Sequence, residues 1–222
     1  MKNTHFFQSK IRETDNPNSP TSKNKILSSK NSSMKDIILV GIQGSGKGTQ
    51  AKLLAQNFGF QIFETGAVLR SMAKENSDLG QKIKRITETG GLVPNEIVME
   101  IIEHFLETAP KGGHFIFDGI PRSEIQRETL EALLKKQKRE FMALEIRLSP
   151  EEAKKRLMAR AQIEGRVDDT PEIIEKRIGV YFEHTKPLLF AWEKTGVLCS
   201  LEGDDSIEKV FKKICTSLAL KK

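Results

Sequence analysis

The stretch that most constrains the fold of this chain is DIILVGIQGSGKGTQAKLLAQNFGF, which covers residues 36–60. It opens with a continuous apolar run at 37–40, passes through closely spaced glycines, and continues as an amphipathic pattern over about 47–57. A continuous apolar run is typical of a strand that is covered on both faces. The order of strand, glycine loop and helix therefore predicts the first unit of a parallel sheet.

The remainder of the sequence repeats the alternation of short apolar runs with longer helical patterns. We expect further strands at 60–63, 114–117, 141–148 and 197–201. Helical patterns occupy about 67–74, 79–87, 94–108, 124–136, 150–160, 171–182 and 206–218, and residues 161–170 form a polar break. Five strands separated by helices predict an α/β fold with three layers, a parallel sheet between helices on both faces.

The glycine loop has the properties of a phosphate site. A helix that begins directly after the loop leaves backbone N–H groups unpaired at its positive end. Glycines at 44, 46 and 48 let the backbone approach phosphate oxygens closely, and Lys47 supplies a positive charge for the outer phosphates. We therefore predict that the segment Gly44–Thr49 binds the phosphates of a triphosphate.

The match to the general pattern G-x-x-x-x-G-K-[ST] runs from Gly41 to Lys47, with Gly48 at the Ser/Thr position and Thr49 one residue later. Two other interpretations compete. A dinucleotide-binding loop could use glycines 44 and 46 with Glu64 as the ribose acceptor, but it lacks the third glycine and gives Lys47 no role. An incidental glycine-rich turn would not explain why strand, loop and helix occur in this order.

Four further stretches place polar residues at strand ends and loop edges: FETGAVLR, GGLVPNE, FIFDGIPRSEIQ and RLMARAQIEGRVDDTPEIIEKR. Each has a plain structural interpretation. Thr65 could cap a helix, Asp118 could belong to a turn at a strand end, and the arginines could form a solvated face. A chain that already carries a phosphate loop favours a binding role for the recurring arginines, since guanidinium groups grip phosphates in pairs of hydrogen bonds.

Together these motifs resemble the nucleoside monophosphate kinases, and the adenylate kinases among them. The resemblance covers about residues 34–218 and rests on GSGKGTQ, TG with Arg70, GLVP, DGIPR with Gln126, and GRVDD with Arg177. It implies an insert at about 64–93 that covers the monophosphate and a short lid at about 160–170. In this family the loop reads G-x-G-K-G-T, so Gly48 is the expected residue.

The resemblance also implies the roles of individual residues. The expected ATP-binding residues are Gly44, Ser45, Gly46, Lys47, Gly48, Thr49, Arg156, Arg160 and Gly203. The expected AMP-binding residues are Thr65, Arg70, Gly91, Leu92, Val93, Gly119, Arg122, Gln126, Arg166 and Arg177. The catalytic set implied is Lys47, Arg122, Arg160, Arg166 and Arg177, and Asp168 and Asp169 would govern lid closure.

Two cofactor expectations follow from the same resemblance. Asp118 would position the Mg²⁺ that accompanies ATP, through water, and no structural zinc is expected because the lid lacks a cysteine cluster. The chain departs from the family pattern at two places. Gln43 stands where proline is usual before the loop, and Ala67 stands where aspartate usually follows TG; we expect both to alter rates without abolishing activity.

The expected reaction is reversible phosphoryl transfer from ATP to AMP. The AMP phosphate is already an anionic nucleophile, so the reaction needs cations rather than a strong base. A glutamine amide can match the paired donor and acceptor of adenine. The pyrimidine kinases that resemble this chain carry asparagine at Gln126 and alanine at Thr65, which makes UMP/CMP kinase the alternative. A P-loop switch protein without turnover is disfavoured, because N-K-x-D is missing after the loop.

The charge distribution and the two cysteines limit the binding partners and the cellular compartment that we expect. The net charge of +6 divides unevenly, because residues 1–33 carry six Lys/Arg against two acids and the other 189 residues carry 30 against 28. We interpret residues 1–33 as disordered and basic. They could be a tail, a tether, or an extension that is absent because translation starts at Met34. The two cysteines, Cys199 and Cys215, have no metal-type spacing. We expect a cytoplasmic monomer whose partners are ATP and AMP, not nucleic acid or membrane.

Overall fold

A computed structural model of the chain describes residues 34–110, 112–164 and 169–220, with the side chain of residue 164 excluded. The predicted tail and the predicted lid residues Arg166 and Asp168 lie outside the described residues. The described part contains a parallel sheet with the strand order β2-β3-β1-β4-β5. Its strands are β1 (Asp36–Val40), β2 (Gln61–Glu64), β3 (Phe115–Asp118), β4 (Phe141–Arg147) and β5 (Leu198–Glu202).

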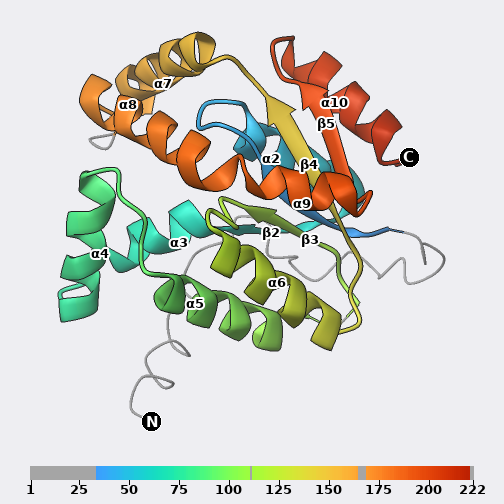
Figure 1. Cartoon of the computed structure of the whole chain (residues 1–222), viewed down its shortest axis with the longest axis horizontal. Coiled ribbons are helices and arrows are strands. Elements are labelled where there is room, and N and C mark those ends of the chain that lie inside the picture. Colours follow the sequence, from blue (N-terminus) through green and yellow to red (C-terminus); the bar gives the residue numbers. More distant parts are fainter. Residues whose placement is uncertain (1–33, 111, 165–168, 221–222) are drawn as a thin grey trace.

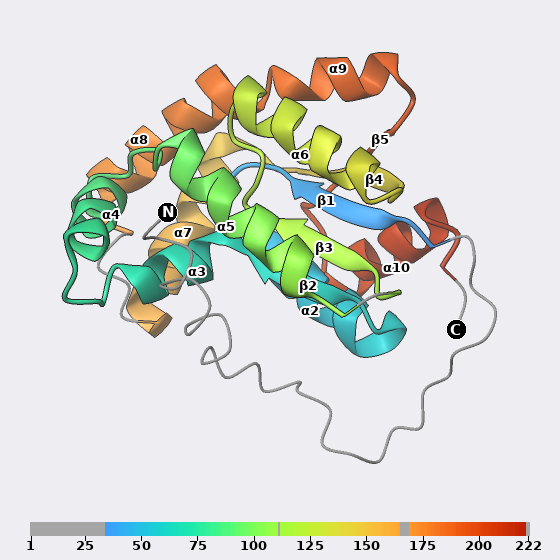
Figure 2. The same cartoon turned by 90° about the horizontal axis from the view of Figure 1, so that it is seen from below.

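Helices cover both faces of the sheet, which confirms the predicted three-layer α/β fold (Figures 1 and 2). One face packs on α2 (Lys47–Phe58) and α10 (Ile207–Ser217), and the other on α5 (Asn95–Thr108), α6 (Glu124–Lys136) and α9 (Leu188–Lys194). Successive residues of β1 serve opposite cores: Ile37 and Leu39 face the α2 side, and Ile38 and Val40 face the α6 side. This alternation explains why the strand is apolar at every position from 37 to 40.

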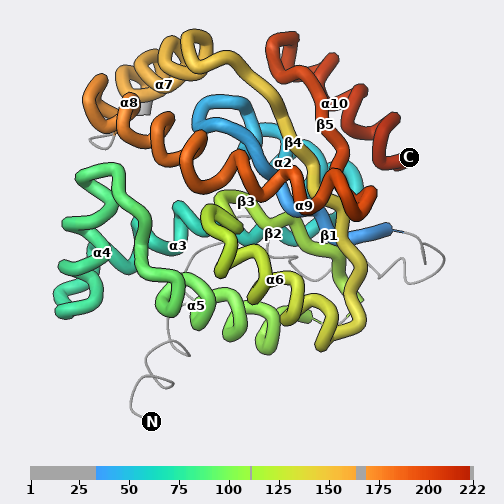
Figure 3. Tube along the Cα trace, viewed as in Figure 1, coloured from blue at the N-terminus to red at the C-terminus, as the bar shows by residue number. Residues whose placement is uncertain are grey.

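Two helix pairs extend from the sheet on the side of its carboxyl edge. The helices α3 (Thr65–Met72) and α4 (Asp78–Glu88) lie between β2 and α5 in the sequence. The helices α7 (Pro150–Glu164) and α8 (Pro171–Val180) pack side by side, as the tube in Figure 3 shows. The helices α3 and α4 fall within the predicted insert at about 64–93, and α7 and α8 flank the predicted lid at about 160–170.

The segment after β4 differs from the prediction in two respects. The helix α7 continues to Glu164, beyond its predicted end at Arg160, because residues 161–164 contain neither glycine nor proline to stop it. The helix predicted from Pro171 through Phe182 ends at Val180 and continues as the π-helical turn η1 (Tyr181–Thr185). The helix α9 that follows was not predicted.

Candidate active site

The carboxyl edge of the sheet brings the glycine loop next to the end of β3. Leu39 of β1 is in register with Asp118 of β3, so the loop after β1 and the residues after β3 leave the sheet together. A cleft of about 690 Å³ opens there. The residues that line it include these predicted site residues: Gly44, Ser45, Gly46, Lys47, Gly48, Thr49, Arg70, Asp118, Gly119, Arg122, Arg156, Arg160, Arg177 and Gly203.

The backbone of the loop requires glycine at two of its positions. Gly44 and Gly46 have φ angles of +85° and +94°, which L side chains rarely adopt. A Cβ atom on Gly44 would also lie 2.9 Å from the carbonyl oxygen of Ala153. The helix α2 starts directly after Gly46, with no capping side chain and no acid in its first turn. Its positive end is therefore available to an anion.

Lys47 lies folded back on the loop that carries it. Its Nζ donates to the carbonyl oxygens of Gly41 at 2.8 Å and Ile42 at 3.0 Å. Burial lowers the pKa of Lys47 to about 8; Asp118 opposes this effect, and Arg122 and other nearby arginines add to it. The ammonium therefore lies among other cations, an environment that a bound polyanion would relieve.

Arg122 lies in the same crowded cationic environment. Burial, Arg177 and Arg70 all lower its pKa, to about 10, and Asp118 only partly offsets them. The Nε atom of Arg122 donates to the carbonyl oxygen of Gly119 at 3.0 Å. Burial raises the pKa of Asp118, although Lys47 acts against this shift. Like charges held this close are costly unless an anion joins them.

Next to the cleft is a smaller cavity that contains most of the predicted AMP-binding residues. It is lined by Thr65, Arg70, Gly91, Leu92, Val93, Gly119, Arg122, Gln126 and Arg177. Gly66, Arg70, Gly119, Arg122 and Arg177 line both spaces. Three arginines therefore stand at the junction of the two cavities.

Thr65 is buried and lines this smaller cavity. Its Oγ1 makes no hydrogen bond with the described residues, and α3 takes Glu64 as its N-cap instead. The interpretation of Thr65 as a helix cap is therefore wrong. A buried hydroxyl without a partner is costly, and a ligand in the cavity could satisfy it. Arg70 pairs with Glu64 at 2.9 Å.

The end of β5 closes the other side of the cleft. Arg156 Nη1 donates to the carbonyl oxygen of Gly203 at 3.2 Å and Nη2 contacts Asp204 at 3.4 Å. A Cβ atom on Gly203 would lie 3.3 Å from the carbonyl oxygen of Ser45. The strand end and the glycine loop are thus in close contact, which accounts for a glycine at 203.

Several lining residues were missed by sequence reasoning. In the smaller cavity these are Gly66, Leu69, Thr87, Gly90 and Val98, and in the cleft Lys52, Asp205, Ser206, Ile207 and Val210. Gly66, Leu69 and Gly90 lie within the quoted stretches FETGAVLR and GGLVPNE and could have been found. The others are ordinary helical or turn residues, and only the packing of their elements brings them to the cavities.

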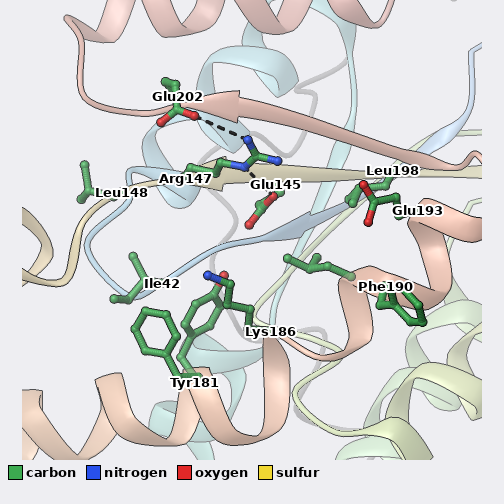
Figure 4. Close-up of a pocket in the computed structure, with 12 residues that line it drawn as sticks. Ile42, Glu145, Arg147, Leu148, Tyr181, Lys186, Phe190, Glu193, Leu198 and Glu202 are labelled. Carbon is green, nitrogen blue, oxygen red and sulfur yellow. Dashed lines mark hydrogen bonds and ion pairs between the residues drawn. The ribbon is translucent and has the colours of Figure 1, made fainter.

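A third cavity, of about 490 Å³, lies over β4 and β5 and contains none of the predicted site residues (Figure 4). Its floor holds the buried Glu145, which accepts hydrogen bonds from Arg147 at 3.0 Å and from Ser200 at 2.7 Å. Burial and the charge of Glu145 raise the pKa of Tyr181 to about 12. Arg147 pairs with both Glu145 and Glu202 in this cavity.

The residues that the structure describes contain no group of three or more His, Cys, Asp or Glu side chains placed to hold a metal ion. None of their helices is both long and apolar enough to cross a membrane.

The parallel sheet, the glycine loop and the arginine-lined junction define a P-loop phosphotransferase with two adjoining pockets. A family model described as adenylate kinase matches residues 39–197. The chain belongs to the adenylate kinase family.

Individual relatives agree with this family. The chain is 36% identical to the adenylate kinase of Thermus thermophilus, over 83% of this chain and 97% of the relative. It is 38% identical to that of Hyphomonas neptunium, over 82% and 97%, and 35% identical to human adenylate kinase isoenzyme 1, over 83% and 94%. The chain is accordingly an enzyme that transfers a phosphoryl group from ATP to AMP, and nothing in the comparisons favours UMP/CMP kinase.

Proposed function

We propose that the two adjoining cavities divide the substrates between them, with ATP in the cleft and AMP in the smaller cavity. The ATP phosphates lie on Gly44–Thr49 and Lys47, with Arg156 and Arg160 beside them and Gly203 near the adenine. AMP lies against Thr65, Arg70, residues 91–93, Gly119, Arg122, Gln126 and Arg177. The observation that carries this proposal is the set of three arginines shared by both cavities.

The arginines at the junction of the two cavities offset the charge repulsion that opposes the reaction. An AMP phosphate that attacks the terminal phosphate of ATP must approach another polyanion, and the repulsion is severe unless cations lie between them. Arg122 and Arg177 line both cavities, and Lys47 approaches from the loop. These groups hold the two phosphates in line, and the nucleophile needs no proton removed.

The residues of the cleft fit a magnesium ion held mainly by substrate. Mg²⁺ binds oxygen ligands, keeps several waters and commonly takes one or two carboxylates plus phosphates. Asp118 offers one buried carboxylate, and its Oδ2 would lie 3.6 Å from a Cβ atom on Gly48, close to the start of α2. When bound with ATP, the ion supplies further neutralisation of phosphate charge. Asp118 would hold the ion through water.

The segments that flank the cleft exclude water during transfer. We place an insert at about 64–93 over AMP and a short lid at about 160–170 over ATP, with Arg166 on the AMP side and Asp168 and Asp169 fixing lid arginines. The enzyme works in the cytoplasm as a monomer without nucleic acid or membrane. Outside residues 1–33 the basic and acidic residues nearly balance, which supports the absence of a nucleic-acid or membrane partner.

A matched pair of variants tests the division of substrates. Thr65→Val should raise the KM for AMP by about fivefold and leave the KM for ATP within twofold, because Thr65 lines only the smaller cavity. Arg156→Met should do the reverse, and each variant is the control for the other. Steady-state kinetics with both substrates varied gives the four values. Equal effects of each variant on both KM values would contradict the proposed division.

A further inference from the structure

We propose that Asn95 is a positioning residue that fixes the Gln126 amide in one orientation and so selects a 6-amino base over a 6-oxo base. The inference rests on the proposed role of Gln126 in reading the base of the acceptor. Asn95 is the first residue of α5, and Gln126 lies in the first turn of α6. The two side chains meet because these two helices pack against each other.

The orientation of Gln126 follows from a backbone donor. The amide N–H of Arg122 donates to Gln126 Oε1 at 2.8 Å. A backbone N–H cannot accept, so the atom that faces it must be the amide oxygen. The amide nitrogen of Gln126 then points the other way, where Nε2 donates to Asn95 Oδ1 at 3.0 Å.

A second donor fixes Asn95 in the matching orientation. The Ser123 hydroxyl caps α6 by accepting from the backbone N–H of Gln126 at 3.3 Å, and it donates its own hydrogen to Asn95 Oδ1 at 2.9 Å. If Asn95 were rotated, its Nδ2 would face the donor nitrogen of Gln126. The oxygen of Asn95 therefore accepts from two donors, and neither amide can turn without losing a hydrogen bond.

What remains free on Gln126 is one acceptor site and one donor, side by side. Oε1 has two lone pairs and Arg122 uses one; Nε2 has two hydrogens and Asn95 takes one. The free acceptor and the free donor of Gln126 complement a base that has a 6-amino group beside an unprotonated N1. A 6-oxo purine presents an acceptor beside an N1–H donor, the reverse pattern. A freely rotating glutamine could serve both, whereas a fixed one serves only the first.

Burial makes the restraint effective. Gln126 is 2% exposed and lines the smaller cavity. If Asn95 is replaced by a residue that offers no acceptor, the buried amide of Gln126 and the partly buried hydroxyl of Ser123 lose a partner. Rotation of the glutamine then no longer costs the hydrogen bond to Asn95.

The test compares AMP with inosine monophosphate, its 6-oxo analogue, as acceptors for Asn95→Leu, which resembles asparagine in size and excludes water. The ratio of kcat/KM for AMP to kcat/KM for inosine monophosphate should fall by about fivefold to tenfold. Most of the change should lie in KM. Asn95→Asp keeps an acceptor oxygen for both donors and should retain the wild-type ratio, while Asn95→Ala, which admits a water, should give an intermediate one.

An unchanged ratio in both Asn95→Leu and Asn95→Ala would overturn the inference, as would a parallel loss of activity with both acceptors. The variant Gln126→Ala distinguishes a failure of the inference about Asn95 from a failure of the proposed role of Gln126. If Gln126→Ala also leaves the ratio unchanged, Gln126 does not read the base. If it alone changes the ratio, Gln126 reads the base without help from Asn95.

Discussion

The carboxylate of Asp169 accepts two hydrogen bonds from Arg160, from Nε at 2.8 Å and from Nη2 at 2.6 Å. Its other oxygen accepts from Arg177 at 2.9 Å. Asp169 is buried, and the two arginines come from α7 and α8. One carboxylate thus fixes two cations of the cleft.

We therefore expect Asp169→Asn to impair both stability and catalysis. Asparagine removes the charge and leaves one oxygen for the two arginines. The free energy of unfolding should fall by about 2 kcal/mol, as for lost hydrogen bonds to charged groups. The kcat should fall by about tenfold or more because the arginines lose their fixed positions. Thermal unfolding and initial rates at saturating ATP and AMP measure both.

The control is an ion pair between the same two helices. Lys154 and Glu175 also link α7 to α8, at 2.7 Å, but both side chains are well exposed. Glu175→Gln should change stability by less than about 0.5 kcal/mol and leave kcat unchanged, since exposed pairs contribute little. Similar losses in both variants would show that holding the two helices together, and not fixing Arg160 and Arg177, accounts for the effect of Asp169.

Lys47→Met should separate activity from stability. The lysine is the cation of the glycine loop, so kcat should fall by about 10²–10³-fold. The folded state lowers the pKa of Lys47 to about 8, which means that folding disfavours its charged form at pH 7. Removing the charge should therefore leave the unfolding midpoint at or above that of the wild type. Coupled-enzyme rates and thermal melts provide the two measurements.

Lys52→Met is the matched control for that variant. Lys52 lies on the same helix, lines the same cleft and is exposed. Its replacement should change kcat by less than about threefold, because an exposed charge is screened by solvent. Near-normal turnover by Lys47→Met would refute the role given to Lys47.

The lowered pKa of Lys47 also predicts how ATP binding depends on pH. Above pH 8 the free enzyme holds Lys47 increasingly neutral, whereas a bound triphosphate favours the ammonium and raises its pKa. Binding must then take up a proton, so ATP affinity should fall as pH rises above 8, by at most about tenfold per pH unit. Below pH 8 Lys47 contributes no such slope.

Titration calorimetry of ATP binding between pH 7 and 9.5 would reveal this dependence. Binding enthalpies in buffers of different ionisation enthalpy count the protons taken up. Lys47→Met should bind weakly but without the slope above pH 8. A wild-type affinity that is flat between pH 8 and 9.5 would show that Lys47 stays charged in the free enzyme.

Local patterns predicted most of the sheet and the position of the glycine loop. The apolar run of β1, the glycines after it and Asp118 at the end of β3 each carry their signal in a few neighbouring residues. The register of parallel strands then brings the loop and Asp118 together without further information.

Features that depend on packing were not predictable in the same way. The π-helical turn η1 has no local signature, because its Lys186 N–H to Tyr181 carbonyl bond differs from an α-helical bond only by one residue. The contact between Asn95 and Gln126 spans 31 positions and exists only because α5 and α6 pack together. Sequence patterns singled out Gln126, but gave no indication of its contact with Asn95.

We expect Gly203→Ala to weaken ATP binding specifically, because Gly203 is closely packed against its neighbours. The added Cβ would lie 2.6 Å from Ile146 Cγ2 and 2.8 Å from the carbonyl oxygen of Arg147, so the backbone must move. Movement of Gly203 displaces it from Ser45 and from the hydrogen bond of Arg156. The KM for ATP should rise by about fivefold, and stability should fall by about 1–3 kcal/mol.

Gly179→Ala is the control because Gly179 lies within α8 and an added Cβ there meets no atom within 4 Å. It should stabilise the protein by up to about 1 kcal/mol through helix propensity and leave both KM values unchanged. For Gly203→Ala the KM for AMP should stay within twofold of the wild type, since the smaller cavity does not include Gly203. Equal increases in both KM values would mean that Gly203 supports the whole sheet edge, not the ATP side of the cleft.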